Sequence, residues 1–90
     1  MIVFPPREEF DDERREIRFP VSVIGKTVVC RVAAADLASR YGGGELPDAV
    51  LAVFRAHRID VEAQVRRKLL QGQYEPDRTI LIRADELARV

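Results

Sequence analysis

The chain has 90 residues, which is enough for one domain with a thin hydrophobic core. Hydrophobic residues make up 47% of it and charged residues 33%, a balance that excludes both a disordered segment and a membrane protein. The 15 Lys and Arg side chains equal the 15 Asp and Glu side chains in number, so no net charge attracts nucleic acid or an acidic membrane. We therefore expect a single globular domain over residues 1–90, with no membrane contact and with nucleic acid disfavoured as a partner.

The chain carries no sign of export. Its longest apolar run, residues 49–54, is far shorter than the roughly 20 residues that cross a bilayer. The first residues lack the basic and then apolar pattern of a secretory signal. The single cysteine, Cys30, forms no intrachain disulfide and suits a reducing compartment. We expect a cytoplasmic protein.

Residues 1–16 are predicted to form a charged, exposed N-terminal arm, because two prolines are followed by a dense run of charges that only Phe10 interrupts. A β-hairpin is predicted over residues 17–33, since apolar and polar residues alternate on both sides of Gly25 and Lys26. A two-residue turn at these positions would place Val21 opposite Cys30. Pro20 indicates that the first strand lies at a sheet edge.

A short helix is predicted over residues 34–41, because Gly42 is suited to end it. One long helix is predicted over residues 47–71, with Pro47 at its first position and no glycine or proline before Gly72. Residues 78–83 alternate as a C-terminal strand. The expected fold is α+β with two layers, in which the long helix packs on the sheet.

Familiar catalytic and cofactor motifs are not recognisable. Gly25, Lys26 and Thr27 resemble the end of a phosphate-binding loop, but Pro20 stands where that loop needs glycine. Cys30 falls on the inward face of the predicted hairpin and is expected to be an inert core residue. One histidine and one cysteine cannot form a typical zinc site. We predict no catalytic residues, no metal and no cofactor, and hence no enzyme.

His57 and Arg58 break the pattern of the long helix, because both fall on its apolar stripe. A buried guanidinium needs a partner, and Asp60 and Glu62 are spaced to serve as local ones. The pair is interpreted first as structural and second as a contact with a ligand or partner. The candidate binding residues are His57, Arg58, Arg55 and Arg31.

The opposite side of the long helix is also apolar, which is unusual for a helix that covers a sheet. Small residues combined with two larger apolar ones can accept another helix, so this side predicts a homodimer or another protein partner. Packing by the arm or by the short helix is the alternative. The residues concerned are Ala52, Ala56, Ile59, Ala63 and Leu70.

Residues spread over nearly the whole chain match one known pattern in order and spacing. They are Phe10 to Arg15, Ile17 to Pro20, Gly25, Cys30, Phe54, Arg55, His57, Arg58, Val61 and Glu62. On these residues the sequence resembles a bacterial family of small proteins described as domain of unknown function 1488, although Phe10 stands where the family pattern has tryptophan. The resemblance implies a two-layer α+β fold, but no activity.

The leading functional hypothesis is a non-enzymatic interaction or regulatory module that acts through the long helix and the outer face of the sheet. The alternative is an accessory protein that binds a small anionic ligand or nucleic acid through arginines of that helix.

Overall fold

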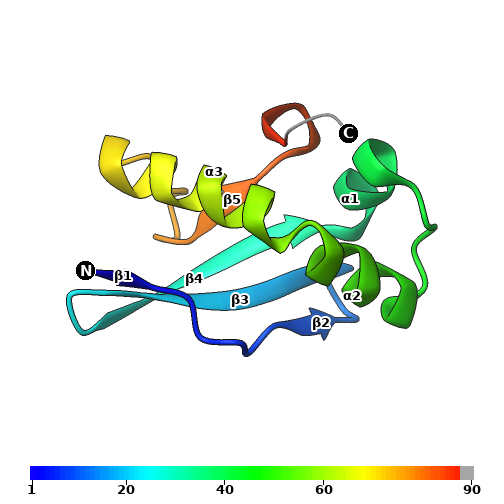
Figure 1. Cartoon of the computed structure of the whole chain (residues 1–90), viewed down its shortest axis with the longest axis horizontal. Coiled ribbons are helices and arrows are strands. Elements are labelled where there is room, and N and C mark those ends of the chain that lie inside the picture. Colours follow the sequence, from blue (N-terminus) through cyan, green and yellow to red (C-terminus); the bar gives the residue numbers. More distant parts are fainter. Residues whose placement is uncertain (88–90) are drawn as a thin grey trace.

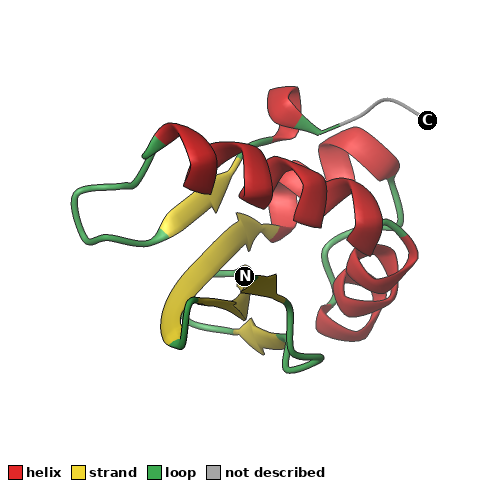
Figure 2. Ribbon diagram, turned by 60° about the vertical axis from the view of Figure 1, so that its left-hand side comes forward, coloured by secondary structure: helices red, strands yellow, loops and turns green. Residues whose placement is uncertain are grey.

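A computed structural model describes residues 1–87 as two layers, with the helices on one face of a mixed sheet (Figure 1, Figure 2). The strands are β1 (Ile2–Val3), β2 (Glu9–Asp11), β3 (Glu16–Val23), β4 (Lys26–Ala33) and β5 (Ile80–Ile82). The helices are α1 (Ala34–Tyr41), α2 (Pro47–Ala56), α3 (Arg58–Gln71) and the short 3₁₀ helix η1 (Ala84–Glu86). The predicted α+β fold class is confirmed.

The sheet has the order β1-β3-β4-β5, and β2 also pairs with β3. All pairs are antiparallel except β4–β5, which is parallel. The helices connect β4 to β5 and cover the face on which the apolar side chains of these strands meet. No helix in residues 1–87 is long and apolar enough to cross a membrane.

The core lies between the two layers. Phe19 of β3 and Phe54 of α2 are its largest side chains, and their ring centroids lie 4.9 Å apart. Cys30 is fully buried beside them, as predicted. The other buried apolar residues are Ile17, Val21, Val32, Ala34, Leu37, Val50, Val61, Val65, Ile80, Ile82 and Leu87.

Residues 1–16 keep many exposed side chains but do not form an arm separate from the sheet, so this part of the prediction was wrong. Residues 2–3 and 9–11 pair with β3 as β1 and β2, and so extend the sheet. The segment between them, residues 4–8, contains two prolines and leaves the sheet. The dense charges suggested solvent exposure, but several of them are neutralised by ion pairs within the fold.

Pro20 lies where neither β1 nor β2 pairs with β3. The N–H of Ile24 donates to Met1 O. The even-numbered residues of β3 therefore direct their backbone N–H and C=O groups toward β1 and β2 rather than toward β4. Pro20 has no N–H, so the gap between β1 and β2 leaves no unpaired donor there. The predicted edge position is therefore wrong for β3 as a whole and describes only this gap.

The hairpin register differs from the prediction by two residues. Val21 lies opposite Val28, and Cys30 lies opposite Phe19. The two turn residues are Ile24 and Gly25, with φ values of 50° and 78°, in keeping with a type I′ turn, which needs positive φ at both positions. A shift of two residues keeps every side chain on its predicted face, so the alternation of apolar residues did not reveal it.

The predicted long helix is divided at His57 into α2 and α3, which corrects the expectation of one element. His57 has φ −113° and ψ 20°, and its N–H is shared between Val53 O and Phe54 O. A straight helix over residues 47–71 would measure about 36 Å, which exceeds the longest dimension of the protein, 34 Å. The bend lets α2 contact β2 and β3 while α3 contacts β5.

Candidate functional site

Arg58 anchors the N-terminal segment to the junction of α2 and α3. Its Nε donates to Glu62 at 2.8 Å, its Nη1 to Glu8 at 2.5 Å, and its Nη2 to the Pro5 carbonyl at 3.1 Å. Arg55 Nε donates to the second oxygen of Glu8 at 2.8 Å. The two guanidinium groups therefore hold one carboxylate between them.

These contacts change the ionisation of Glu8. The hydrogen bond from Arg55 and the interactions with Arg58 lower its pKa to about 2, although burial acts in the opposite direction. The Glu8 side chain is only 9% exposed. The predicted partner Glu62 is present, whereas no sequence pattern indicated Glu8, which is 50 residues away from Arg58.

His57 lies beside this cluster and stacks on Tyr41. The ring centroids are 3.6 Å apart and the rings are nearly parallel, at 4°. Asp60, the predicted local partner, lies 4.0 Å from His57 Nδ1. Within residues 1–87 the buried Tyr41 hydroxyl has no hydrogen-bond partner, and burial raises its pKa. His57 thus fills the bend between the helices as a packed ring.

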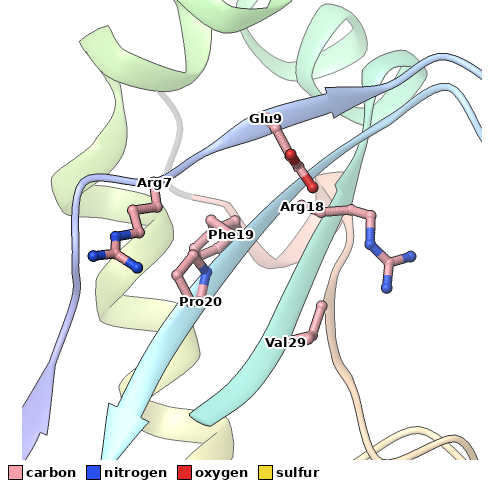
Figure 3. A pocket seen from close by; sticks show the side chains of 6 residues that line it. All are labelled: Arg7, Glu9, Arg18, Phe19, Pro20 and Val29. Carbon is pink, nitrogen blue, oxygen red and sulfur yellow. The ribbon is translucent and has the colours of Figure 1, made fainter.

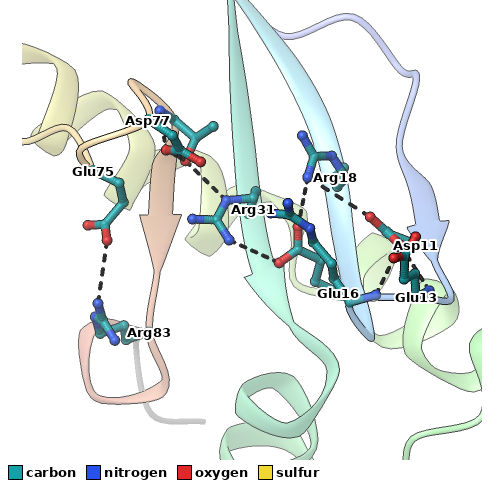
Figure 4. A network of polar contacts seen from close by, with 10 residues as sticks. Asp11, Glu13, Glu16, Arg18, Arg31, Glu75, Asp77 and Arg83 are labelled. Atoms are coloured by element: carbon teal, nitrogen blue, oxygen red, sulfur yellow. Dashed lines mark hydrogen bonds and ion pairs between the residues drawn. The ribbon is translucent and has the colours of Figure 1, made fainter.

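Arg31 lies on the other face of the sheet, away from the three helical candidates. Its Nη1 donates to Glu16 at 3.1 Å and its Nε to Thr79 Oγ1 at 3.0 Å. Glu16 also accepts from Arg18 at 3.1 Å (Figure 4). The four predicted binding residues therefore do not form one site.

The network of Glu16, Arg18 and Arg31 on the open face of the sheet was not predicted from the sequence. Arg18 and Arg31 are directly opposite each other in the correct register, and like charges at such positions repel. Glu16, nearly buried, lies between them and accepts from both. The alternation of Glu16 and Arg18 along one strand was the available signal, but it required the correct hairpin register.

A shallow groove of about 450 Å³ opens at the gap between β1 and β2. Figure 3 shows Arg7 and Arg18 on either side of Phe19 and Pro20. Arg18 is already paired with Glu16, and Glu9 adds a negative charge to the lining. The groove therefore offers no net charge that selects a ligand. Its lining residues are Arg7, Glu9, Arg18, Phe19, Pro20 and Val29.

Within residues 1–87, the outward face of α3 carries exposed apolar side chains together with the exposed Arg66, which lies about 20° from Ile59 around the helix. Ile59 is 82% exposed and Leu70 is 81% exposed. They are eleven residues apart, which places them about 20° from each other around the helix. Ala63, between them, is exposed as well. Val61 and Val65, on the opposite side, are fully buried in the core.

Comparisons with known proteins agree with this fold. The model of the family described as "Protein of unknown function (DUF1488)" matches residues 2–82. The "Uncharacterized protein YrdB" of Escherichia coli (strain K12) is 40% identical over 76 residues, covering 84% of this chain and 87% of that protein. The protein of the same name from Shigella flexneri has the same identity and coverage.

A solved structure shows the same fold. The crystal structure of a protein of unknown function of the DUF1488 family from Shewanella loihica PV-4 superposes with a TM-score of 0.83. It covers 91% of both chains at 19% sequence identity. This likeness extends over the sheet and the helices, and the family match and the bacterial relatives extend over most of the sequence. The chain belongs to the DUF1488 family of small bacterial proteins of unknown function.

Proposed function

We propose that this protein is a non-enzymatic interaction module that binds a protein partner through the outward face of α3. The observation that supports this most is the exposure of Ile59 and Leu70 on one side of a helix whose other side forms the core. Burying a large aliphatic side chain contributes about 1.5 to 3 kcal/mol. Two such side chains on one face therefore provide a binding surface that a small domain does not need for its own folding.

The predicted alternative, an anionic ligand or nucleic acid held by arginines, has less support. Arg55 and Arg58 are both bonded to Glu8, and Arg31 is bonded to Glu16. A ligand anion would have to displace these carboxylates. Breaking a largely buried charge pair costs several kcal/mol. The arginines fit better as structural groups, and their role in binding stays a prediction.

The groups that could act as nucleophile or base support a non-enzymatic role. Burial raises the pKa of the Cys30 thiol to about 12, which keeps the reactive thiolate scarce at neutral pH. The His57 ring is stacked on Tyr41. Neither group faces the open groove at the sheet edge.

We infer that the protein works in the bacterial cytoplasm. Support comes from its single cysteine, which is buried as a free thiol and so suits a reducing compartment. Fractionation of cells that produce the tagged protein tests this. Recovery in the cytoplasmic fraction is expected, and recovery in the periplasm would contradict it.

The proposed surface can be tested in living cells with a photoreactive amino acid. Placed at Ala63, between Ile59 and Leu70, it should give discrete cross-linked protein species. The same group at Ala35, an exposed position on α1, is the matched control and should not give them. Adding Leu70→Asp to the protein that carries the photoreactive amino acid at position 63 should abolish the cross-linked species. No cross-link at position 63, or the same species from both positions, would show that this face is not the binding surface.

A further inference from the structure

We infer that the partner bound by the outward face of α3 is a second copy of this chain, packed antiparallel about a two-fold axis. This inference rests on the proposed function and identifies its partner. In the arrangement, Ile59 of each copy faces Leu70 of the other copy. A two-fold axis makes the contact isologous, so the contact between Ile59 of one copy and Leu70 of the other occurs twice in the pair.

The charges beside the apolar face support the antiparallel direction. Asp60 and Arg67 lie on the same flank, at about 100° and 80° from Ile59 around the helix. In an antiparallel pair the same flanks of the two helices face each other. With Ile59 opposite Leu70, Asp60 comes within about two residues, or roughly 3 Å along the axis, of Arg67 in the other copy. The pair therefore gains two attractive contacts, one on each side of the axis.

Both charges are available for this contact. The Asp60 and Arg67 side chains are each 45% exposed. Within residues 1–87, Asp60 approaches His57 at 4.0 Å, and Arg67 approaches Glu86 at 3.9 Å. The Arg67 Nε also donates to Gln64 Oε1 at 2.9 Å, a bond that the Nη groups do not take part in. The two ion pairs are long and exposed, so they add little stability. A new partner of opposite charge can replace them at small cost.

The middle of the face permits a close approach. Ala63 of one copy lies opposite Arg66 of the other, so a small side chain meets a long one. The Arg66 guanidinium is turned toward the ring of Phe4, 5.0 Å from its centroid. The aliphatic part of Arg66 can therefore cover Ala63 without bringing its charge into the contact.

The size of the contact predicts weak association. One helix pair buries less surface than the roughly 1,200 to 2,000 Å² of a stable protein interface. We expect a dimer that dissociates below about 100 µM and is well populated near 1 mM. Because salt screens the attraction between Asp60 and Arg67, the dimer should be weaker at high salt.

Two charge variants test the arrangement by sedimentation equilibrium. Asp60→Arg places like charges opposite each other, and so does Arg67→Asp, so each alone should associate at least tenfold more weakly than the wild type. An equimolar mixture should recover wild-type association, because every contact in the mixed dimer is attractive. Thermal melts of each variant confirm that it is folded. A mixture that associates no better than its components would overturn the inference.

Single cysteines determine the direction of the helices. A mixture of Ile59→Cys and Leu70→Cys proteins should form a mixed disulfide faster than either protein forms one with itself. Rapid cross-linking of Ile59→Cys with itself would indicate a parallel pair and overturn the inference. A wild type that stays monomeric near 1 mM also overturns it. If position 63 then still cross-links another protein in cells, the proposed function stands; if it cross-links none, both fail.

Discussion

The Glu8 carboxylate is held by Arg58 across a separation of 50 residues, and this contact joins the N-terminal segment to the bend between α2 and α3. The Arg58 guanidinium also binds Glu62 and the Pro5 carbonyl, and it lies over the ring of Phe54 at 5.4 Å. The N-terminal segment is therefore part of the folded domain. The two residues that the sequence marked as a conflict, His57 and Arg58, lie at the point where the long helix bends.

Arg58→Ala should destabilise the domain by about 2 to 4 kcal/mol, because it removes three hydrogen bonds and leaves two largely buried carboxylates short of a partner. Arg55→Ala is the matched control. It also removes a bond to Glu8, but the Arg55 side chain is 59% exposed, so its loss should cost at most about 1 kcal/mol. Urea melts of the three proteins measure the difference. An unchanged midpoint for Arg58→Ala would show that this residue is not structural.

The pairing of Glu8 with Arg55 and Arg58 should make the free energy of unfolding depend on pH. Its pKa is lowered from 4.5 to about 2 in the folded protein, so the stabilisation is fully present above about pH 4.5 and is lost as the pH falls toward 2. The loss amounts to as much as about 3 kcal/mol. Glu8→Gln should flatten this part of the curve of unfolding free energy against pH. A variant as steep as the wild type between pH 4.5 and 2 would place the dependence on other carboxyl groups.

Ile24→Asn should stabilise the hairpin by about 0.5 to 1 kcal/mol. Ile24 has φ 50° and is 81% exposed, and a β-branched residue is strained in this conformation. Asn followed by Gly25 is the favoured pair for a type I′ turn. Ile24→Val, equally β-branched, is the control and should bring no gain. A lower melting temperature for Ile24→Asn would argue that the turn does not have this geometry.

Cys30 should react slowly with thiol reagents in the native state, because it is fully buried and its pKa is raised to about 12. Labelling at pH 8 should be limited by unfolding and should accelerate greatly in denaturant. Native protein that reacts as fast as denatured protein would indicate an accessible thiol and a redox role.

The sequence predicted the parts of the fold that depend on local pattern. Alternation along β3 and β4 identified the inward faces, and Gly42 and Gly72 indicated the ends of α1 and α3. The register of the hairpin was missed because a shift of two residues preserves the faces. The register depends on whether Ile24 or Lys26 joins Gly25 in the two-residue turn. Because a β-branched residue at positive φ is unusual, the sequence favoured Lys26 over Ile24.

The candidate site depended on contacts that no local pattern reports. The bend at His57 contains neither glycine nor proline, so it follows from packing against the sheet and Tyr41 rather than from propensity. Glu8 was one of many charges in the arm, and its pairing with Arg58 required the arm to join the sheet. The exposed apolar side of the helix was predicted because Ile59 and Leu70 both lie in α3, after the bend, and so keep the helical spacing of the sequence pattern.

Self-association of two copies through the outward face of α3 can be observed residue by residue. Spectra that correlate each backbone ¹⁵N with its proton should be recorded from about 50 µM to 1 mM. We expect concentration-dependent shifts at Ile59, Ala63, Arg66 and Leu70, and none at Arg18 and Arg31 on the open face of the sheet. Shifts confined to the open face, or no shifts together with unchanged rotational diffusion, would show that two copies do not associate through α3.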